Sequence, residues 1–327
     1  MSGGRDPGTA PGAAFYCVAD ERYFVGAVSL VNSLRLLGHR EPIHVLDCGL
    51  TEPQRELLAA QATLHSARGD SPPWLLKTEA PLAAPAEAMI LLDTDMVATR
   101  SLRPLAERAV EGRIVVFANP VQRRTDGWGE LLGLGPMRGM PYVSSAAIAA
   151  EGELGGRILN LLSDLQGHVD FDRTWWRAGE SDYPWLYADQ DILNAILATR
   201  VDEDRIDVLD EQLAPTPPFS GLRLLDEQGL RCAYADGTEP YLVHHHVVKP
   251  WLQPTHHGIY SRLMRRLLIG PDLAIRVPEA EIPPHMRGGI RAWALRARVN
   301  ARERVRWHVR EPLAARVRGR GADGRKG

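Results

Sequence analysis

Short apolar runs alternate with helix-patterned segments at the start of the chain, and this alternation limits the fold more than any other feature of the sequence. Residues 13–20 (AAFYCVAD) and 42–49 (PIHVLDCG) are apolar runs of strand length. Residues 23–38 repeat apolar side chains at steps of three and four and end at Gly38, which predicts an amphipathic helix. Residues 51–64 begin with a capping-box pattern (TEPQ) and predict a second helix. This β-α-β-α order predicts a parallel sheet with helices on its faces.

Later segments extend this pattern. Apolar runs at residues 88–95, 112–119 and 141–150 predict three more strands. Residues 188–199 predict a short helix, and residues 239–252 predict a strand that leads into a proline-ended loop. The sequence has no internal repeat, so the pattern indicates an α/β domain and not a repeat architecture.

The composition is that of a globular protein that can bury its own core. The chain has 327 residues, 44% hydrophobic and 24% charged, enough for one large domain or two small ones. We interpret its three widely spaced cysteines as reduced thiols, which predicts a cytoplasmic protein. Residues 1–14 lack the apolar core of a signal peptide and predict a disordered lead. No apolar run approaches the roughly 18 residues that a transmembrane helix needs.

Charge is distributed unevenly along the chain. The formal net charge is -2, but residues 261–327 contain 17 Lys and Arg against 6 Asp and Glu, a net charge of +11 that leaves -13 for the rest. A basic tail predicts an anionic partner, and Ile290 and Trp293 would share a helix face suited to the inner surface of a membrane. A solvated helix packed on the body is the alternative. No recognition motif supports nucleic-acid binding.

Aspartates follow two of the predicted strands. Asp20 ends the first, while Asp93 and Asp95 end the run ILLDTD. Ligands of open α/β sheets bind outside the carboxyl ends of the strands. If the strand continued past Leu92, Asp93 and Asp95 would point to the same face and repel each other unless a cation lay between them. Mg²⁺ or Mn²⁺ suits such oxygen ligands, although two solvated aspartates in a turn are an alternative.

The segment HHHVVKPW, residues 244–251, is the second candidate for a site. It follows an apolar run, so at least one of its histidines is expected to face inward, where a neutral imidazole can bind a transition metal. Lys249 adds a fixed positive charge close by. This combination favours a site for metal and phosphate together over a surface histidine run or a structural core histidine.

Two further pairs of polar residues have structural alternatives. Asp189 and Gln190 begin a predicted helix, where acidic residues often serve only as caps, and Asp191 is predicted to do so. Asp20 and Tyr23 fit an ordinary strand-to-helix turn with Asp20 as the N-cap. We favour this cap over the alternative, in which Asp20 hydrogen-bonds a nucleobase and Tyr23 stacks on it.

Taken together, these segments resemble glycosyltransferase family 8, a family of retaining enzymes with the GT-A fold. Its members include bacterial lipopolysaccharide galactosyl- and glucosyltransferases and glycogenin. Six segments match in the family's order: FYCVADERYF, IHVLDCGLTEPQRELLAA, MILLDTDMVATRSLRPL, YVSSAAIAA, YADQDILNAIL and HHHVVKPW. They span Phe15 to Trp251. The resemblance implies a Rossmann-like, mixed, mainly parallel sheet flanked by helices. It divides the chain into a lead (1–14), a nucleotide-sugar transferase domain (15–258) and a basic, mostly helical extension (259–327).

The resemblance also implies a metal and phosphate site. Asp93 and Asp95 would bind Mn²⁺ or Mg²⁺ bridging two phosphates of a nucleotide sugar, with His244 as the third protein ligand. Lys249 would hold a phosphate. The family's spacing between histidine and lysine ranks the three candidates in the order His244, His245, His246.

The remaining implied roles lie on the donor side. Asp20 and Tyr23 would hold the base, expected to be uracil. Asp189 would contact the donor sugar and Gln190 would lie on its reacting face. Lys77 stands nearest to the place of a family arginine and would contact the donor without that residue's bidentate fork.

The match to the family is incomplete at one donor-contacting motif. Ser144, Ser145 and Ala146 stand where the family has Asn-(Ala/Ser)-Gly. Serine still hydrogen-bonds sugars, so Ser144 and Ser145 are predicted to contact the donor, whose identity stays open. The segment between residues 49 and 90 is also short for the family.

The expected function is therefore a metal-dependent retaining hexosyltransferase. It would move a hexose from a nucleotide sugar, expected to be a UDP-sugar, to a hydroxyl acceptor such as a glycan, a glycolipid or a small natural product. One alternative is a phosphatase of the haloacid dehalogenase type, whose D-x-D-x-(T/V) motif Asp93 and Asp95 satisfy as nucleophile and general acid. Another is a non-catalytic relative that only binds a nucleotide sugar.

Overall fold

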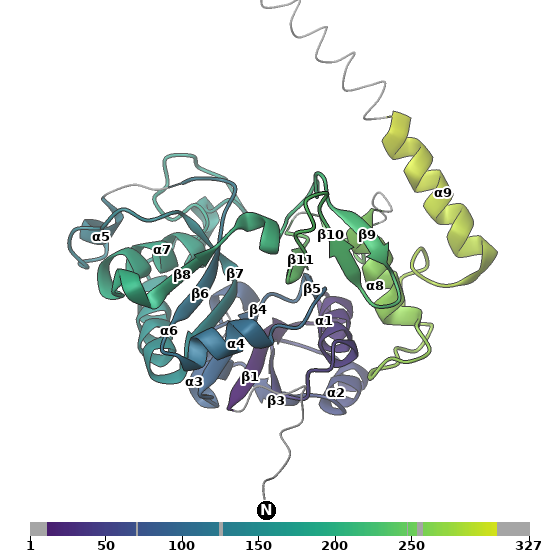
Figure 1. The fold of residues 1–327 in the computed structure, drawn as a ribbon, viewed down its shortest axis with the longest axis horizontal. Helices are drawn as coiled ribbons and strands as arrows, with labels where there is room; N and C mark the ends of the chain where they lie inside the picture. Colours follow the sequence, from purple (N-terminus) through teal and green to yellow (C-terminus); the bar gives the residue numbers. More distant parts are fainter. Residues whose placement is uncertain (1–11, 70, 124–126, 247, 254–257, 306–327) are drawn as a thin grey trace, which may run out of the picture.

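A seven-stranded sheet organises the part of the chain that the computed structural model describes, which comprises residues 12–69, 71–123, 127–246, 248–253 and 258–305 (Figure 1). The strand order is β3-β2-β1-β4-β7-β6-β8. β7 is antiparallel to both neighbours, and all other pairs are parallel. The predicted mixed, mainly parallel sheet is confirmed. The strands are β1 (Ala13–Ala19), β2 (Ile43–Asp47), β3 (Thr63–Ser66), β4 (Ala88–Leu92), β6 (Ile114–Ala118), β7 (Val143–Glu151) and β8 (Ile206–Leu209).

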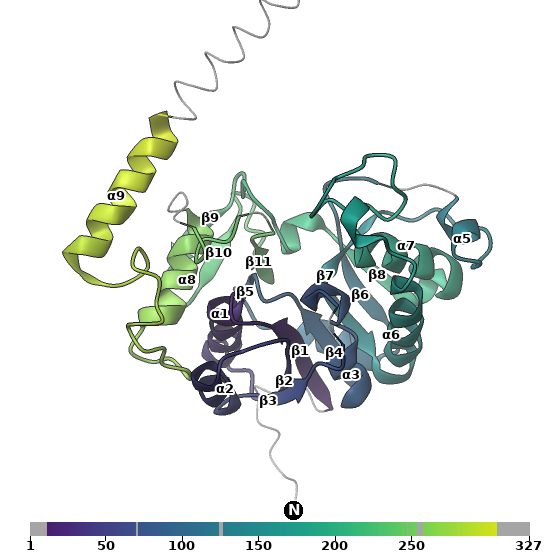
Figure 2. The same cartoon turned by 180° about the vertical axis from the view of Figure 1, so that it is seen from behind.

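Helices cover both faces of this sheet (Figures 1 and 2). Side chains of α1, α2, α4 and α8 pack into the core on one face, and those of α3, α5, α6 and α7 into the core on the other. The helices are α1 (Phe24–Leu36), α2 (Glu52–Ala59), α3 (Glu79–Ala83), α4 (Arg103–Val110), α5 (Trp128–Leu131), α6 (Gly152–Gln166), α7 (Asp189–Arg200), α8 (Ile259–Ile269) and α9 (Gly289–Val305).

The side chains of β1 contribute to both hydrophobic cores. Successive side chains of a strand point to opposite faces of the sheet. Phe15 and Cys17 accordingly lie in the core with α1, whereas Ala14 and Tyr16 lie in the core with α6. The continuous apolar run is therefore explained by a central strand that is buried on both faces.

α1 is buried more completely than its sequence pattern predicts. Residues 24–34 are all buried, so the helix has no solvent face along this stretch. The predicted helix is present, but an amphipathic pattern does not predict burial on all sides, which arises because α8 packs on the side that would face water. Asn32 makes this contact specific. Its amide donates to the carbonyls of Leu267 and Ile275, both at 2.9 Å, and its side-chain oxygen accepts from the Ile275 N–H at 2.8 Å.

Asn32→Ala is expected to lower the free energy of unfolding by about 2–4 kcal/mol. The substitution leaves three buried backbone groups without their partner, and each unpaired group costs about 1–3 kcal/mol with partial relief by water. Urea unfolding measures the loss. Asn160→Ala is the control, because Asn160 is exposed and bonds only within its own helix; its effect should stay near 0.5 kcal/mol. A loss below about 1 kcal/mol for Asn32→Ala would contradict the role we assign to this residue.

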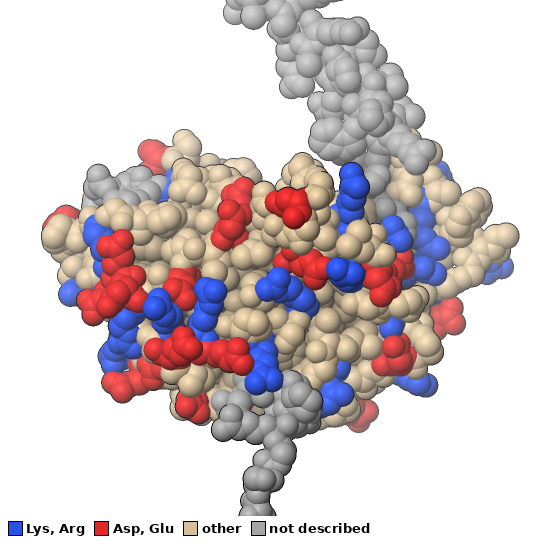
Figure 3. Space-filling view, viewed as in Figure 1, with Lys and Arg blue, Asp and Glu red and all other residues tan. Residues whose placement is uncertain are grey.

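The C-terminal region has two parts. Between Tyr260 and Met286, apolar side chains join the same core as α1. α9 then stands away from the body in both views (Figures 1 and 2). Figure 3 shows basic side chains gathering on the side where α9 lies, whereas acidic and basic side chains alternate over the rest of this face. The division of the chain into three parts stays a prediction, since both ends lie partly outside the described residues. Among the described helices, none is both long and apolar enough to span a bilayer.

Two small sheets complete the fold. β5 (Met96–Ala98) pairs antiparallel with β11 (Leu242–His244), and β9 (Arg223–Asp226) pairs with β10 (Arg231–Ala233). The β5–β11 pair brings His244 opposite Met96, just after the turn that follows β4. Gly26 lets α1 approach this turn closely, because a Cβ there would lie 2.4 Å from the Thr94 carbonyl oxygen.

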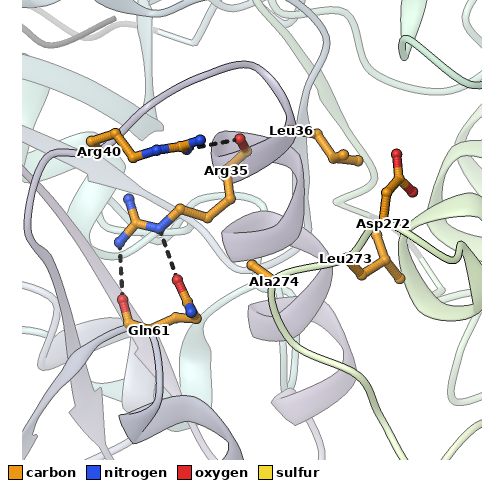
Figure 4. Close-up of a pocket in the computed structure, with 7 residues that line it drawn as sticks. All are labelled: Arg35, Leu36, Arg40, Gln61, Asp272, Leu273 and Ala274. Atoms are coloured by element: carbon orange, nitrogen blue, oxygen red, sulfur yellow. Dashed lines mark hydrogen bonds between the residues drawn. The ribbon is translucent and has the colours of Figure 1, made fainter. Parts of the chain in front are cut away.

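A shallow pocket lies near the carboxyl end of α1, between this helix and residues 272–274 (Figure 4). Arg35 dominates it. Its guanidinium donates to the Gln61 side chain and to the backbone carbonyls of His39, Glu41 and Gln61 at 3.0–3.2 Å. Four of its five N–H groups are thus used to hold neighbouring loops, which indicates a structural role.

Candidate active site

The turn after β4 carries the two aspartates of the DTD motif. β4 ends at Leu92, and the Met96 N–H donates to the Asp93 carbonyl at 3.1 Å, so a tight turn links β4 to β5. The strand therefore does not continue through the motif, and the expectation based on strand alternation was wrong. The Asp93 N–H donates to Ala146 of β7 at 2.8 Å, which fixes the turn against the sheet. Both carboxylates still converge, because the turn and not a strand directs them.

Asp93, Asp95 and His244 form a cluster with the chemistry of a metal site. One carboxylate oxygen of each aspartate and one ring nitrogen of His244 all lie within 4.8 Å of one another. His244 Nε2 and Asp95 Oδ1 are 3.2 Å apart, yet the geometry is not that of a hydrogen bond, and neither atom has a hydrogen-bond partner among the described residues. Two buried polar atoms without hydrogen-bond partners, close to a second carboxylate, suit a divalent ion. The residues present therefore fit Mn²⁺ or Mg²⁺.

Each aspartate also has a lysine partner. Lys249 Nζ makes an ion pair with Asp95 Oδ2 and donates to the His245 carbonyl at 2.9 Å. Burial alone would raise the pKa of Asp95, but the nearby His244 and Lys249 outweigh it and hold the pKa well below its usual range. Burial raises the pKa of Asp93, against the opposing effect of Lys77, whose ammonium lies 3.4 Å away. Lysine ammonium groups therefore compensate the carboxylates of Asp93 and Asp95, in addition to any metal ion.

Lys77 is buried as well, and it joins three segments of the chain. Its ammonium is 2.7 Å from Asp189 Oδ2, and it donates to the Ser145 carbonyl at 3.2 Å. Burial would lower the pKa of this lysine, but Asp189 and Asp93 raise it above its ordinary value. The interpretation of Asp189 as a simple helix cap is therefore wrong, because the side chain is the buried partner of Lys77.

A strained residue aims Asp189 at this lysine. Ala188 has φ 47 and ψ -115 and occupies the N-cap position of α7 without a side-chain cap bond. A non-glycine residue in such a conformation stores on the order of 1–3 kcal/mol and persists only where surrounding contacts enforce it. The strain lets α7 begin with Asp189 pointing inward.

Gln190 is positioned by an irregularity in β7. Between Val116 and Phe117 of β6 the pairing moves from Ile148 to Ser144, so three residues of β7 lack a partner on β6. The Ser145 N–H in this bulge donates to Gln190 Oε1 at 3.3 Å. The Gln190 amide in turn donates to the Tyr142 hydroxyl at 2.9 Å. The bulge thus frees backbone groups of β7 to hold site residues.

Three residues that the sequence analysis missed support Gln190. Asn194 bonds both the N–H and the carbonyl of Val143 at 2.8 Å and so fastens α7 to β7. Tyr142 links Gln190 to Asp191, whose Oδ1 accepts its hydroxyl at 2.5 Å. Arg123 reaches Asp191 Oδ2 from 3.4 Å. The spacing of four between Gln190 and Asn194 is the one signal that pointed to a shared helix face.

Asp191 does not act as the N-cap of α7, as had been predicted. It is fully buried, and besides Tyr142 and Arg123 it accepts the Tyr187 N–H at 2.8 Å. It therefore joins the loop before α7 to the sheet.

The stability of the protein is expected to depend on pH through Asp191. Burial raises the pKa of this carboxyl from 3.8 to about 6, against the opposing effects of Tyr142 and Arg123. A carboxyl with a higher pKa in the folded state binds protons more tightly when folded, so its contribution to stability falls as the pH rises from about 4 to 6. Asp191→Asn cannot titrate. Its free energy of unfolding relative to wild type should rise by about 3 kcal/mol between pH 4 and 7 in urea unfolding. A difference that does not change with pH would contradict this.

Asp20 and Tyr23 lie on the other side of the cluster. Asp20 Oδ1 accepts the Tyr23 N–H at 2.8 Å, which closes the turn before α1. Tyr23 itself takes the N-cap position, so Asp20 is not the helix cap that we had favoured. The Tyr23 ring meets Trp251 edge-on at 5.7 Å and lies 6.0 Å from Lys249 Nζ. Both residues are thus brought to the edge of the cluster.

The two serines differ in position. Ser145 Oγ lies 3.4 Å from Lys77 Nζ, within the site. Ser144 Oγ accepts the Ala146 N–H at 3.2 Å and closes a local turn. Of the three histidines, His244 belongs to the cluster in the described structure, and the pKa values of His245 and His246 are lowered to about 4, mainly by burial.

Comparison with known proteins identifies the fold. No protein-family model matches the sequence, and no curated protein matches it. Solved structures do match. An active-site mutant of LgtC is 17% identical with a TM-score of 0.53, covering 82% of this chain and 98% of that one. The galactosyltransferase LgtC with donor and acceptor sugar analogs is 17% identical with a TM-score of 0.52, covering 79% and 98%. The bifunctional glycosyltransferase WbbM is 14% identical with a TM-score of 0.52, covering 80% and 50%. The predicted GT-A fold is confirmed.

Proposed function

We propose that the protein is a metal-dependent retaining glycosyltransferase that moves a hexose from a nucleotide sugar to a hydroxyl acceptor. The observation that carries this proposal is the cluster of Asp93, Asp95 and His244, placed with Lys77 and Lys249 at the carboxyl edge of a GT-A sheet. Ligands of open α/β sheets bind at this edge.

The charges of the cluster support a metal between protein and diphosphate. The carboxylates of Asp93, Asp95 and Asp189 outnumber the ammonium groups of Lys77 and Lys249 by one. A site with this net negative charge would repel a diphosphate. One divalent ion reverses the sign and makes the site attractive to an anion.

The residues divide into a phosphate side and a base side. Asp93, Asp95 and His244 would hold Mn²⁺ or Mg²⁺, which when bound neutralises charge that develops on the leaving nucleoside diphosphate. Lys249 would exchange its contact with Asp95 for a phosphate oxygen. Asp20 and Tyr23 would contact the base, and Ser144 and Ser145 would contact the donor, which we propose to be a UDP-sugar. The position of the Tyr23 ring, 6.0 Å from Lys249 Nζ, supports its role.

The reacting face of the sugar would meet Asp189 and Gln190. LgtC has been solved as an active-site mutant in which a glutamine is changed to glutamate. In the present protein Gln190 follows Asp189 at the start of α7 and accepts the Ser145 N–H. Asp189 is held by Lys77, and an amide is a weak nucleophile, so a front-side reaction fits better than a covalent intermediate. The bond from the acceptor oxygen to the anomeric carbon forms as the bond to the leaving phosphate breaks. The acceptor proton then passes to the leaving phosphate oxygen.

The phosphatase alternative is less consistent with the electrostatics. It needs Asp95 as a general acid, but His244 and Lys249 keep the pKa of this buried carboxyl low and so keep it ionised. A general acid near neutral pH needs a raised pKa. The non-catalytic alternative would retain nucleotide-sugar binding without transfer.

Thermal-shift measurements on the purified protein test the proposal. The ligands are UDP, GDP and a set of UDP- and GDP-sugars, each with Mn²⁺, Mg²⁺ or EDTA. A ligand that binds only the folded state raises the melting temperature. We expect stabilisation by a UDP-sugar that requires the metal, followed by release of UDP over time. No shift with any nucleotide, in a protein that melts cooperatively, would overturn the proposal; a shift without UDP release would favour the non-catalytic alternative.

We further propose that the basic C-terminal region contacts the inner surface of a membrane, with the body in the cytoplasm. On α9, Ile290 and Trp293 are 81% and 62% exposed among arginines. Cosedimentation with anionic and with zwitterionic vesicles tests this. We expect the protein to bind anionic vesicles and the binding to weaken as salt is added. Equal recovery of the protein in the supernatant with anionic and with zwitterionic vesicles would refute membrane contact.

A further inference from the structure

Four aromatic side chains gather beside the candidate active site, and two of them are exposed. Trp175 and Trp176 are 61% and 47% exposed. Their rings lie 6.1 and 6.4 Å from the ring of Tyr187, which precedes Asp189 by two residues. Trp74 stacks on Trp176 at 6.0 Å with an interplanar angle of 20°. We call Trp74, Trp175, Trp176 and Tyr187 the aromatic platform.

The aromatic platform lies close along the chain to both partners of the Lys77–Asp189 ion pair. Trp74 lies in a 3-10 turn (Pro73–Leu75) that ends just before the lysine. On the other side, the Trp175 N–H donates to the Leu186 carbonyl at 2.9 Å, next to Tyr187. The segment between α6 and α7, which carries both exposed tryptophans, rises above the carboxyl ends of the strands (Figures 1 and 2). The platform therefore stands at the rim of the site.

Two adjacent exposed tryptophans indicate a ligand. Tryptophan is large, rarely fully buried, and energetically dominant at binding surfaces, where its flat faces give contact area at low entropic cost. Within the described residues these two rings cover little of the core. A sugar ring has an apolar C–H face that fits such a surface while its hydroxyls stay hydrated.

The charge around the aromatic platform selects among sugars. Arg123 lies 5.9 Å from the Tyr187 ring but is paired with Asp191. The segment between α6 and α7 carries four carboxylates and two guanidinium groups: Asp170, Asp172, Glu180, Asp182, Arg173 and Arg177. Arg173 is already paired with Glu180 at 2.6 Å. An excess of negative charge disfavours phosphorylated or acidic sugars.

We propose that the aromatic platform is the acceptor subsite and that the acceptor is an uncharged pyranose. Trp175 and Trp176 stack on its apolar face and so direct one of its hydroxyls toward the side of Asp189 and Gln190. This inference rests on the proposed glycosyltransferase function and names the acceptor class for it.

The test separates acceptor use from donor use. UDP release from UDP-glucose and UDP-galactose with Mn²⁺ is measured with and without lactose, maltose and cellobiose. The variants are Trp175→Ala and Trp176→Ala, and the matched control is Trp293→Ala, an exposed tryptophan on α9. For the platform variants we expect kcat/KM for the acceptor to fall on the order of tenfold or more. Acceptor-independent UDP release and stabilisation by UDP should stay within about twofold of wild type, and the control should match wild type.

Direct binding complements turnover. Saturation-transfer NMR of methyl β-glucoside and methyl β-glucuronide, with UDP and Mg²⁺, is expected to show contact for the uncharged sugar alone, lost in Trp176→Ala. A wild-type protein that neither binds nor cleaves any nucleotide sugar overturns the proposed function and the platform with it. A wild-type protein that binds UDP but no glycoside through these tryptophans, or that prefers the glucuronide, overturns the platform alone.

Discussion

Replacing Asp95 by Asn is expected to abolish the stabilisation of the protein by UDP and Mn²⁺. Wild type at a ligand concentration near 100 times Kd should gain about 2.7 kcal/mol. The variant should gain less than about 0.5 kcal/mol, because the neutral amide binds the metal ion more weakly and removes a negative charge that favours a dication at this site. Melting temperatures are compared with and without ligand for each protein separately. This removes the cost of the variant itself, in which Lys249 loses its buried partner.

Asp47→Asn is the matched control for this prediction. Asp47 also ends a strand at the carboxyl edge and makes an ion pair with Arg55 at 2.5 Å, but it lies outside the cluster of Asp93, Asp95 and His244. It should keep the full ligand-dependent shift. If Asp95→Asn keeps the shift as well, the cluster does not hold the metal that the nucleotide needs.

The central strands of the sheet were predictable because they are buried on both faces, whereas the edge strands β3 and β8 are only partly buried and were not predicted. The alternation over residues 13–59 and the run before Asp93 needed only periodicity and caps. The helix predicted over residues 51–64 was too long, because it ends at Ala59 and Thr63–Ser66 form β3. The complete burial of α1 was not predictable, since the side that would face solvent is covered by α8, more than two hundred residues later in the sequence. A local sequence pattern cannot predict a contact between segments so far apart in the chain.

The grouping of Asp93, Asp95 and His244 was predictable from the sequence, whereas the ion pairs around these residues were not. The strand-end position of Asp93 and the inward-facing histidine of HHHVVKPW pointed to the cluster, and the resemblance ranked His244 first. The pair of Lys77 and Asp189 depends on the bulge in β7 and on the strained Ala188, neither of which has a sequence signal. The exposed tryptophans lie in a segment without periodicity, so their place beside the site required the fold.

Lys77→Met is expected to lower the free energy of unfolding by about 3–5 kcal/mol and to abolish transfer. The substitution removes the buried cation that holds Asp189 at 2.7 Å and Asp93 at 3.4 Å, and an uncompensated buried charge costs this much. The pKa of Lys77 is raised above its ordinary value of 10.5. A base with a raised folded pKa contributes stability that is fully present below its unfolded pKa and lost only as the pH rises above it. Urea unfolding at pH 7 therefore measures the whole contribution.

A double-mutant cycle separates this pairing from loss of the lysine alone. If Lys77 and Asp189 compensate each other, Asp189→Asn should restore on the order of 2 kcal/mol of the stability lost in Lys77→Met. Arg157→Met, which removes an exposed ion pair with Glu153, should cost about 0.5 kcal/mol or less. Two results would contradict the pairing: losses of stability that simply add in the double mutant, or a loss for Lys77→Met no larger than that for Arg157→Met. Either would mean that Lys77 contacts solvent or donor and does not position Asp189. If the double mutant regains stability but not transfer, the pair serves both folding and donor binding, since Lys77 also lies 3.2 Å from the Ser145 carbonyl.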